Sequence, residues 1–360
     1  MPPAVNRHIL RSGPLVAFAV LFGVASANQP MAGPPEFLQL LRTRVGFSDR
    51  DLSVTLSAGR SRAMLLPVQE KGEIAVAGAE RLRVPLEFFL NAFREMPTFK
   101  RGREVLLVHE FSSPPSEIDL QSLTLRQGDI QAIPKCTPGD CTVKLSAPMM
   151  DQLRRHALGA TSTERAFRDL ILQYLTQYLE KGNSAMITYV DKLPAIRSSD
   201  EFRALLNELD WLSLNAPPLY DCLESFSGNP CPQIESFFYW SSARFGLKPV
   251  FSITHVMIYR TVRAGQPWVF IAFKQVYADH YFDASLGLAV LVEQSAGPAN
   301  PALWVLYINR SRTDALKGWL GPLKRTIAER RSRAAMQRTL LDLKDNLEHK
   351  YSPSSEPSWR

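Results

Sequence analysis

The sequence lacks the short motifs that bind phosphate groups or activate nucleophiles. It has no glycine-rich phosphate loop, no Gly-x-Ser-x-Gly elbow and no His-Glu-x-x-His pair. Histidine and cysteine are also scarce, with six and four residues among 360. These absences argue against phosphate-binding, α/β-hydrolase and zinc-protease chemistry. The sequence therefore favours a binding protein over an enzyme.

Long hydrophobic runs are missing after the first residues of the chain. Arg7 and Arg11 precede an apolar run at 14–24, and Ala25-Ser-Ala27 follows. This order is typical of a secretory signal peptide, residues 1–27, that is cleaved near Ala27. No later stretch approaches the roughly 20 apolar residues of a membrane helix. We therefore expect an exported, soluble mature protein, periplasmic or extracellular, with an uncleaved N-terminal anchor as the alternative.

The four cysteines form two close pairs in the sequence. Cys136 and Cys141 enclose Thr-Pro-Gly-Asp, a turn sequence, and Cys222 and Cys231 enclose a loop with Ser-Gly-Asn-Pro. In an oxidising compartment this spacing predicts two local disulfides, Cys136–Cys141 and Cys222–Cys231. A four-cysteine zinc site is the alternative, although the spacings are wider than in a zinc knuckle. We expect no metal ion and no other cofactor.

Basic residues are scattered along the chain, whose formal net charge is +7, except near its C-terminal end. The basic group there consists of Arg310, Arg312, Lys317, Lys324, Arg325, Arg330, Arg331 and Arg333. A basic helix face contacts anionic lipid or nucleic acid, or is simply solvated. Because export makes nucleic acid unsuitable as a partner, we expect transient contact with a membrane surface and no nucleic acid.

Hydrophobic periodicity divides the mature chain into successive regions. Residues 28–72 form an N-terminal extension with a short amphipathic helix at 36–45. Strands and core helices alternate at 73–233, which either completes the fold of the next region or forms a separate domain. Residues 234–350 predict an antiparallel meander followed by a long helix, and residues 351–360 a disordered tail. The meander strands are expected at 234–245, 249–262, 268–277, 286–293 and 302–309.

The terminal helix carries two apolar stripes on nearly opposite sides. The first stripe consists of Leu316, Leu320, Leu323, Ile327, Ala334 and Leu341. The second stripe consists of Met336, Leu340, Leu343 and Leu347. A helix that only covers a sheet needs one stripe, so something else must cover the other, unless the helix bends or has a partly exposed end.

The segment Asn309–Leu347 resembles the end of the START family, the lipid-transfer domains related to steroidogenic acute regulatory protein. The resemblance rests on the turn Asp314-Ala-Leu-Lys-Gly-Trp-Leu-Gly-Pro322 and the long helix, and with the preceding strands it covers about residues 234–350. Ala315 and Gly321 depart from the family's pattern. Residues 128–145, with their Cys-x-Pro-Gly-Asp-Cys element, resemble a group of exported bacterial proteins.

The START resemblance implies an α+β helix-grip fold, in which a curved antiparallel sheet grips the long C-terminal helix, with additional N-terminal and middle helices. It also implies an apolar ligand, such as a lipid, a sterol-like molecule or an isoprenoid, between sheet and helix. Strand parity and the first stripe suggest these pocket residues: His255, Met257, Tyr259, Phe273, Tyr277, Trp319, Leu320, Leu323 and Ile327. The polar or headgroup candidates are Lys274, His280, Arg310 and Arg312, and for the two arginines an ion pair with a carboxylate across the joint between strand and helix is the alternative.

Two other functions are compatible with the sequence. An enzyme would use His255 or the polar cluster at 277–283 as acid and base, provided that these side chains converge. A polar hairpin and a hydrogen-bonded core histidine explain the same residues without catalysis. An envelope interaction module would dock on a partner through the second stripe or the helix at 36–45. The sequence leaves the ligand's identity and the oligomeric state open.

Overall fold

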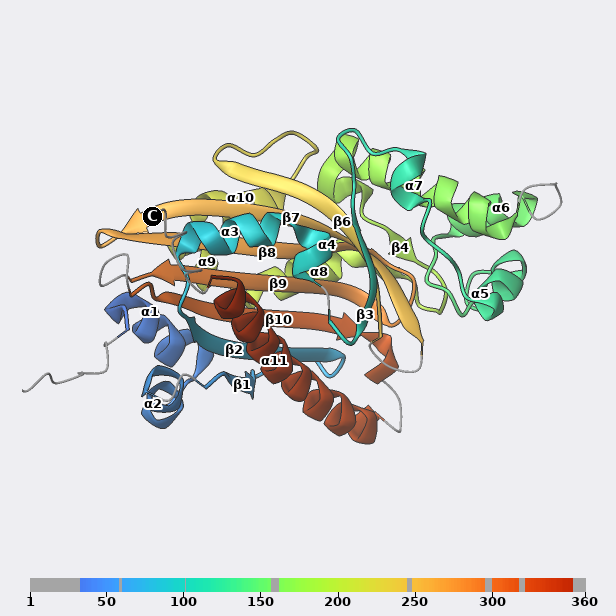
Figure 1. Ribbon diagram of the computed structural model, residues 1–360. Coiled ribbons are helices and arrows are strands. Elements are labelled where there is room, and N and C mark those ends of the chain that lie inside the picture. Colours follow the sequence, from blue (N-terminus) through green and yellow to red (C-terminus); the bar gives the residue numbers. More distant parts are fainter. Residues whose placement is uncertain are drawn as a thin grey trace, which may run out of the picture. The chain divides into compact units, whose positions relative to one another are not determined.

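The computed structural model describes residues 33–57, 60–100, 102–156, 162–244, 248–294, 300–316 and 321–351. Within these residues an eight-stranded antiparallel sheet has the order β1-β2-β10-β9-β8-β7-β6-β3 (Figure 1). Its strands are β1 Arg62–Leu65, β2 Glu73–Leu82, β3 Val105–Glu110, β6 Ile234–Arg244, β7 Pro249–Arg263, β8 Gln266–Ala278, β9 Phe282–Glu293 and β10 Leu303–Thr313. A small second sheet pairs β4 Thr188–Tyr189 with β5 Ile196–Arg197.

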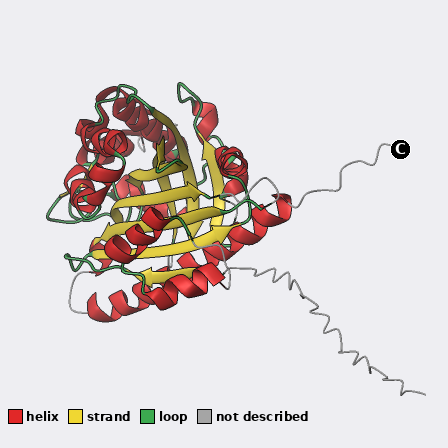
Figure 2. Cartoon of the chain, turned by 90° about the vertical axis from the view of Figure 1, so that its left-hand side faces the viewer, coloured by secondary structure: helices red, strands yellow, loops and turns green. Residues whose placement is uncertain are grey.

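Helices flank this sheet and connect its strands (Figure 2). The α-helices are α1 Pro35–Leu40, α2 Asp49–Ser57, α3 Leu86–Arg94, α4 Met96–Phe99, α5 Gln127–Ala132, α6 Ala147–His156, α7 Thr163–Lys181, α8 Ser198–Asn207, α9 Trp211–Asn215, α10 Pro217–Ser225 and α11 Gly321–Tyr351. Shorter helical turns are η1 Leu41–Val45, η2 Glu117–Leu120, η3 Ile133–Lys135, η4 Gly182–Ala185 and η5 Asp314–Leu316. The α+β class and the long C-terminal helix predicted from the sequence are confirmed.

The five meander strands predicted from the sequence correspond to β6 through β10. Their aromatic and β-branched residues suit a pleated sheet that is covered on both faces. The β7–β8 hairpin has a two-residue turn in which Ala264 and Gly265 both have positive φ, at 47° and 76°. Turns of this kind match the twist of the flanking strands, and glycine adopts the second position without strain. This turn therefore fixes the register between β7 and β8.

Successive side chains of a strand point to opposite faces of the sheet, so a separate hydrophobic core lies on each face. On the first face, Met257, Phe270 and Leu288 pack with residues of α1, α7, α8 and α10. On the second face, Ile271 and Leu291 pack with α3 and with the C-terminal part of α11. The predicted docking helix at 36–45 corresponds to α1 and η1, and its apolar residues are buried in the first core. A partner therefore cannot dock on that apolar face, and this part of the envelope-module hypothesis is wrong.

The terminal helix packs on β2 and β1 through its second stripe. Met336, Leu340 and Leu347 are buried, whereas Leu323, Ile327 and Leu341 of the first stripe are 62%, 46% and 39% exposed. The prediction that the first stripe faces the sheet is therefore wrong for α11, although Leu316, which precedes this helix, is buried. The hypothesis that a partner docks on the second stripe is also wrong, because Met336, Leu340 and Leu347 are buried.

The second stripe packs on β2 at Gly78, where the absence of a side chain lets the helix approach the strand closely. A Cβ atom at this position would lie 2.5 Å from Leu340 Cδ1 and 2.9 Å from Met336 Cγ. Ala63 and Val76 complete the contact as small neighbours on β1 and β2. Lys344 adds an ion pair, with its Nζ 3.4 Å from Glu80 Oε1. The helix and the sheet thus touch directly at this point, and their own side chains fill the space in which a ligand was predicted.

We expect Gly78→Val to lower the free energy of unfolding by about 1–3 kcal/mol, because the new methyl groups overpack the contact with α11. Gly128→Val is the control, since no atom lies within 4 Å of the Cβ that it would add. Denaturant unfolding measures both variants. Equal stability of the two variants would show that α11 is not seated closely on β2.

Both predicted disulfides, Cys136–Cys141 and Cys222–Cys231, are formed. They engage all four cysteines of the sequence. The zinc alternative is thereby wrong. Along the described residues we find no helix with the length and apolar character that a membrane crossing requires.

Candidate functional site

The predicted pocket residues lie on both faces of the sheet and do not line one space. His255, Met257 and Tyr277 are buried on the first face among helices. Tyr259 is partly buried at the edge of that core. Phe273 points to the second face, where its ring lies 5.8 Å from that of Phe93. The predicted pocket is therefore not assembled from these strands.

The remaining pocket candidates belong to the terminal helix and its approach. Leu323 and Ile327 are exposed on the side of α11 that faces away from the sheet. Trp319 and Leu320 lie outside the described residues. No pair of these helix and strand candidates therefore meets in a shared cavity among the described residues.

Lys274 is fully buried on the first face, beneath aromatic rings. Its Nζ lies 4.3 Å from the ring centroid of Phe202 and 5.3 Å from that of Tyr178, and it donates a hydrogen bond to Asn183 Oδ1. Among the described residues no carboxylate pairs with it. Burial lowers the pKa of Lys274 to about 7, because the charged form loses its hydration. The predicted headgroup contact is not possible for this side chain without unfolding of its surroundings.

His255 is the strand neighbour of Lys274 and shares its aromatic surroundings. Its ring stacks on Phe238 at 4.1 Å between centroids, and its Nδ1 lies 3.3 Å from the Tyr178 hydroxyl. Burial, together with the charge of Lys274, lowers the pKa of His255 well below its ordinary value. The side chain is therefore neutral and closed off from solvent. This arrangement is the hydrogen-bonded core histidine that the sequence offered as the simpler explanation.

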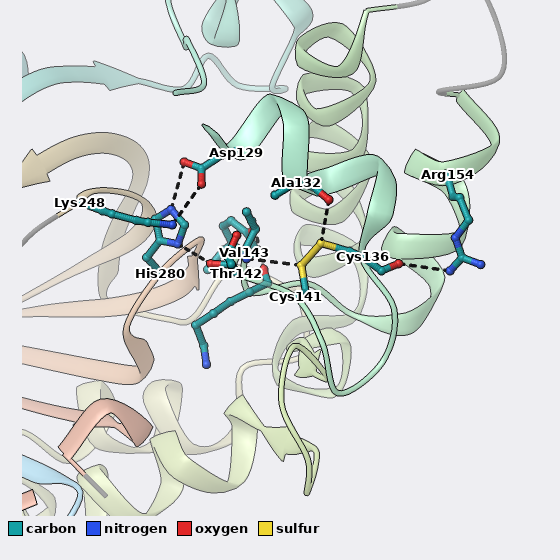
Figure 3. Close-up of a disulfide and its surroundings, with 11 residues drawn as sticks. Asp129, Ala132, Cys136, Cys141, Thr142, Val143, Arg154, Lys248 and His280 are labelled. Carbon is teal, nitrogen blue, oxygen red and sulfur yellow. Dashed lines mark hydrogen bonds and ion pairs between the residues drawn. A yellow bond between two sulfur atoms is a disulfide. The ribbon is translucent and has the colours of Figure 1, made fainter. Parts of the chain in front are cut away.

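His280 belongs to a separate buried cluster next to the Cys136–Cys141 disulfide (Figure 3). Its Nε2 lies 3.3 Å from Asp129 Oδ2, and its Nδ1 lies 3.0 Å from the carbonyl oxygen of Thr142. Lys248 approaches the other oxygen of Asp129 at 3.4 Å. These contacts connect α5 to the start of β7 and the β8–β9 turn. His280 and His255 share no contact partner among the described residues, so the converging acid–base site of the enzyme hypothesis is not formed.

Charges inside this cluster shift one another's protonation. Burial lowers the pKa of His280, but the hydrogen bond to Asp129 and the charge of Asp279 outweigh it and raise the pKa above its ordinary value. Burial raises the pKa of Asp279 to about 7. The described residues contain no group of three histidine, cysteine or acidic side chains arranged to hold a metal ion. The ion pairs of Asp129 with His280 and Lys248 join separate elements of the fold.

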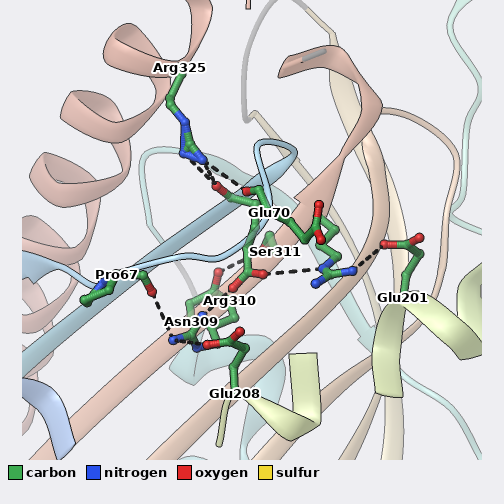
Figure 4. A network of polar contacts seen from close by, with 10 residues as sticks. Pro67, Glu70, Glu201, Glu208, Asn309, Arg310, Ser311 and Arg325 are labelled. Atoms are coloured by element: carbon green, nitrogen blue, oxygen red, sulfur yellow. Dashed lines mark hydrogen bonds and ion pairs between the residues drawn. The ribbon is translucent and has the colours of Figure 1, made fainter. Parts of the chain in front are cut away.

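Arg310 and Arg312, the other headgroup candidates, are paired with carboxylates. Figure 4 shows this network around Arg310. Both guanidinium groups contact the buried carboxylate of Glu73 on β2. Arg310 also lies 3.4 Å from Glu208, and Arg312 lies 3.1 Å from Glu201 of α8. Three acidic groups thus neutralise two arginines, which leaves no net positive charge for an anionic headgroup. The network connects β2, β10 and α8.

The exposed side of α11 combines cationic and apolar side chains, and we call it the outer face of α11. It consists of Leu323, Ile327, Arg330, Arg331, Ala334, Arg338 and Leu341, all exposed. A hollow of about 330 Å³ lies along it, lined among the described residues by Ile327, Arg330, Arg331, Ala334 and Arg338. None of these three arginines forms an ion pair with a described acidic residue. Arg325, by contrast, points inward and donates to the carbonyl oxygens of Glu70 and Glu73.

The periodicity of the sequence predicts the first stripe but not its exposure, and Arg338 is not among the predicted basic residues of this region. A signal for the correct side was present in the sequence. At about 100° per residue, Arg330, Arg331 and Arg338 fall on the same side as Leu323 and Ile327. Arginine side chains are mostly exposed in folded proteins, so this stripe is the one expected to face solvent.

No protein-family model matches the chain, and no curated protein sequence matches it.

Proposed function

We propose that this protein is exported and binds anionic lipid surfaces through the outer face of α11, taking up apolar lipid chains there. The observation that carries the proposal is an exposed helix face that combines aliphatic side chains with three arginines that pair with no acidic side chain among the described residues. The two disulfides support export, because such bonds persist in oxidising compartments. The START resemblance of this segment, and a long helix packed on an antiparallel sheet, support a lipid as the ligand.

The ligand belongs on the outside of α11 because the inside is filled. Met336 and Leu340 meet β2 at Gly78, where not even a methyl group fits without displacing side chains. Leu347 closes the contact further along the helix. Leu323, Ile327 and Leu341, by contrast, present apolar surface to solvent. A helix face of this kind lies in the plane of a membrane interface without crossing it.

Charge and apolar burial contribute similar free energies to this binding. Each arginine near an anionic surface contributes about 1 kcal/mol, and each fully buried aliphatic side chain contributes about 1.5–3 kcal/mol. Three exposed arginines and three partly exposed aliphatic residues therefore give reversible binding that requires anionic lipid and weakens with salt.

Co-sedimentation with vesicles tests the proposal. We expect the protein to bind phosphatidylcholine vesicles that contain phosphatidylglycerol, and to bind pure phosphatidylcholine vesicles at least tenfold more weakly. The triple variant R330E/R331E/R338E should lose at least tenfold in affinity for the anionic vesicles, because it reverses the charge of the outer face.

The control variant R103E/R126E/R155E makes the same change in net charge at exposed arginines elsewhere. It should keep most of the binding. Equal losses in the two triple variants would show that net charge alone drives association, and absence of binding by the wild type would refute the proposal.

A further inference from the structure

The three arginines of the outer face surround one hollow instead of spreading along the helix. Arg330, Ala334 and Arg338 follow one another at intervals of four residues, so they form one line along the helix surface. The methyl group of Ala334 leaves space between its two long neighbours. Arg331 borders the same hollow from the side. The side chains of all three arginines therefore border one open hollow on the helix surface.

Guanidinium groups recognise phosphate oxygens through paired hydrogen bonds, which lysine cannot form. A phosphodiester headgroup offers two non-bridging oxygens and one negative charge. A phosphomonoester offers three such oxygens and a charge of about −1.5 to −2 near neutral pH. The phosphomonoester therefore matches three guanidinium groups better than the phosphodiester, both in the number of its oxygens and in its charge. Ile327, on the same hollow, supplies an apolar contact for the lipid chain next to the headgroup.

We infer that the hollow around Ala334 is a headgroup site for lipids that carry a terminal phosphate monoester, bound by Arg330, Arg331 and Arg338. This inference rests on the proposed function, since it names the lipid class that the outer face of α11 prefers. The Arg310 and Arg312 network does not compete for this ligand, because its guanidinium groups are already paired with Glu73, Glu201 and Glu208.

The test compares two vesicle compositions at equal zeta potential, one with phosphatidate and one with phosphatidylglycerol. We expect the wild type to bind the phosphatidate vesicles about tenfold more tightly. The variant R330K/R331K/R338K keeps the charge but loses the paired donors. It should bind phosphatidate and phosphatidylglycerol vesicles with about equal affinity. Its affinity for phosphatidylglycerol vesicles should stay within about twofold of the wild type.

A second variant, Ala334→Leu, fills the hollow while all three arginines remain. It should also lose the preference for phosphatidate, whereas its binding to phosphatidylglycerol should persist. Because these positions are exposed, thermal unfolding should be unchanged in both variants.

Equal affinity of the wild type for both vesicles, or a preference retained by the lysine variant, would overturn the headgroup site and leave the proposed function intact. Absence of binding to either vesicle would contradict both. Inorganic phosphate that bound as tightly as the phosphatidate vesicles would show a site for the free anion and would overturn the lipid assignment.

Discussion

Replacing Glu73 with alanine should lower the free energy of unfolding by about 3–5 kcal/mol. Glu73 is fully buried and contacts the guanidinium groups of both Arg310 and Arg312. Its removal leaves two largely buried cations that share the more peripheral carboxylates of Glu201 and Glu208. An uncompensated buried charge loses its hydration without an equivalent partner, and this loss determines the size of the effect.

Denaturant unfolding measures this effect, with Glu70→Ala as the matched control. Glu70 is exposed, and only its carbonyl oxygen takes part in the contacts with Arg325. The control should therefore change stability by no more than about 0.5 kcal/mol. The double variant E73M/R310M should recover part of the loss, because it removes the central pair together. Equal stability of Glu73→Ala and Glu70→Ala would show that the network contributes little.

The variant Lys274→Met should remove a large pH dependence of stability between pH 7 and 10.5. In the folded protein the pKa of Lys274 is about 7, against 10.5 for the ordinary side chain. Between these values the unfolded chain binds a proton that the folded protein does not. The wild type is therefore destabilised progressively as the pH falls from 10.5 to 7, by up to about 5 kcal/mol, and the loss is complete below pH 7.

The difference in unfolding free energy between Lys274→Met and the wild type isolates this contribution, because the buried tyrosines titrate in both proteins. We expect the variant to gain stability relative to the wild type as the pH is lowered through this window. Lys71→Met, at an exposed position, should show no such trend. A pH-independent difference would show that Lys274 keeps its ordinary pKa and is charged in the folded protein.

The sequence predicted elements that depend on neighbouring residues. Strands β6 to β10 follow one another through short turns, and the period of two in their side chains is visible in each strand. The two disulfides close loops of a few residues, so their pairing is also local. By contrast, the pairing of β2 with β10 and of β3 with β6 joins segments that lie far apart in the sequence. Local periodicity carries no information about such contacts.

Two features determine which side of α11 packs on the sheet, and only one of them is local. The arginines beside the first stripe favour its exposure, and the absence of a side chain at Gly78 on β2, far away in the sequence, gives the second stripe its contact. For Arg310 and Arg312 the sequence leaves a headgroup or a carboxylate as the partner, and the acidic partners, Glu73 and Glu201, are remote in sequence. The candidate site therefore shifted from the inner to the outer face of the same helix.

The position of α11 on a lipid surface can be measured with a spin label at Ile327. Since all four native cysteines are in disulfides, Ile327→Cys introduces the single thiol available for labelling. Leu214→Cys on α9 is the control, because Leu214 is 76% exposed on another element. The measurement compares collisions of the label with apolar oxygen and with a water-soluble nickel chelate.

On addition of vesicles that contain phosphatidylglycerol, we predict more oxygen collisions and fewer nickel collisions for the label at Ile327, and no change at Leu214. This result would place the outer face of α11 in the lipid. A label at Ile327 that remains in water while the protein is bound to the vesicles would contradict the proposed function.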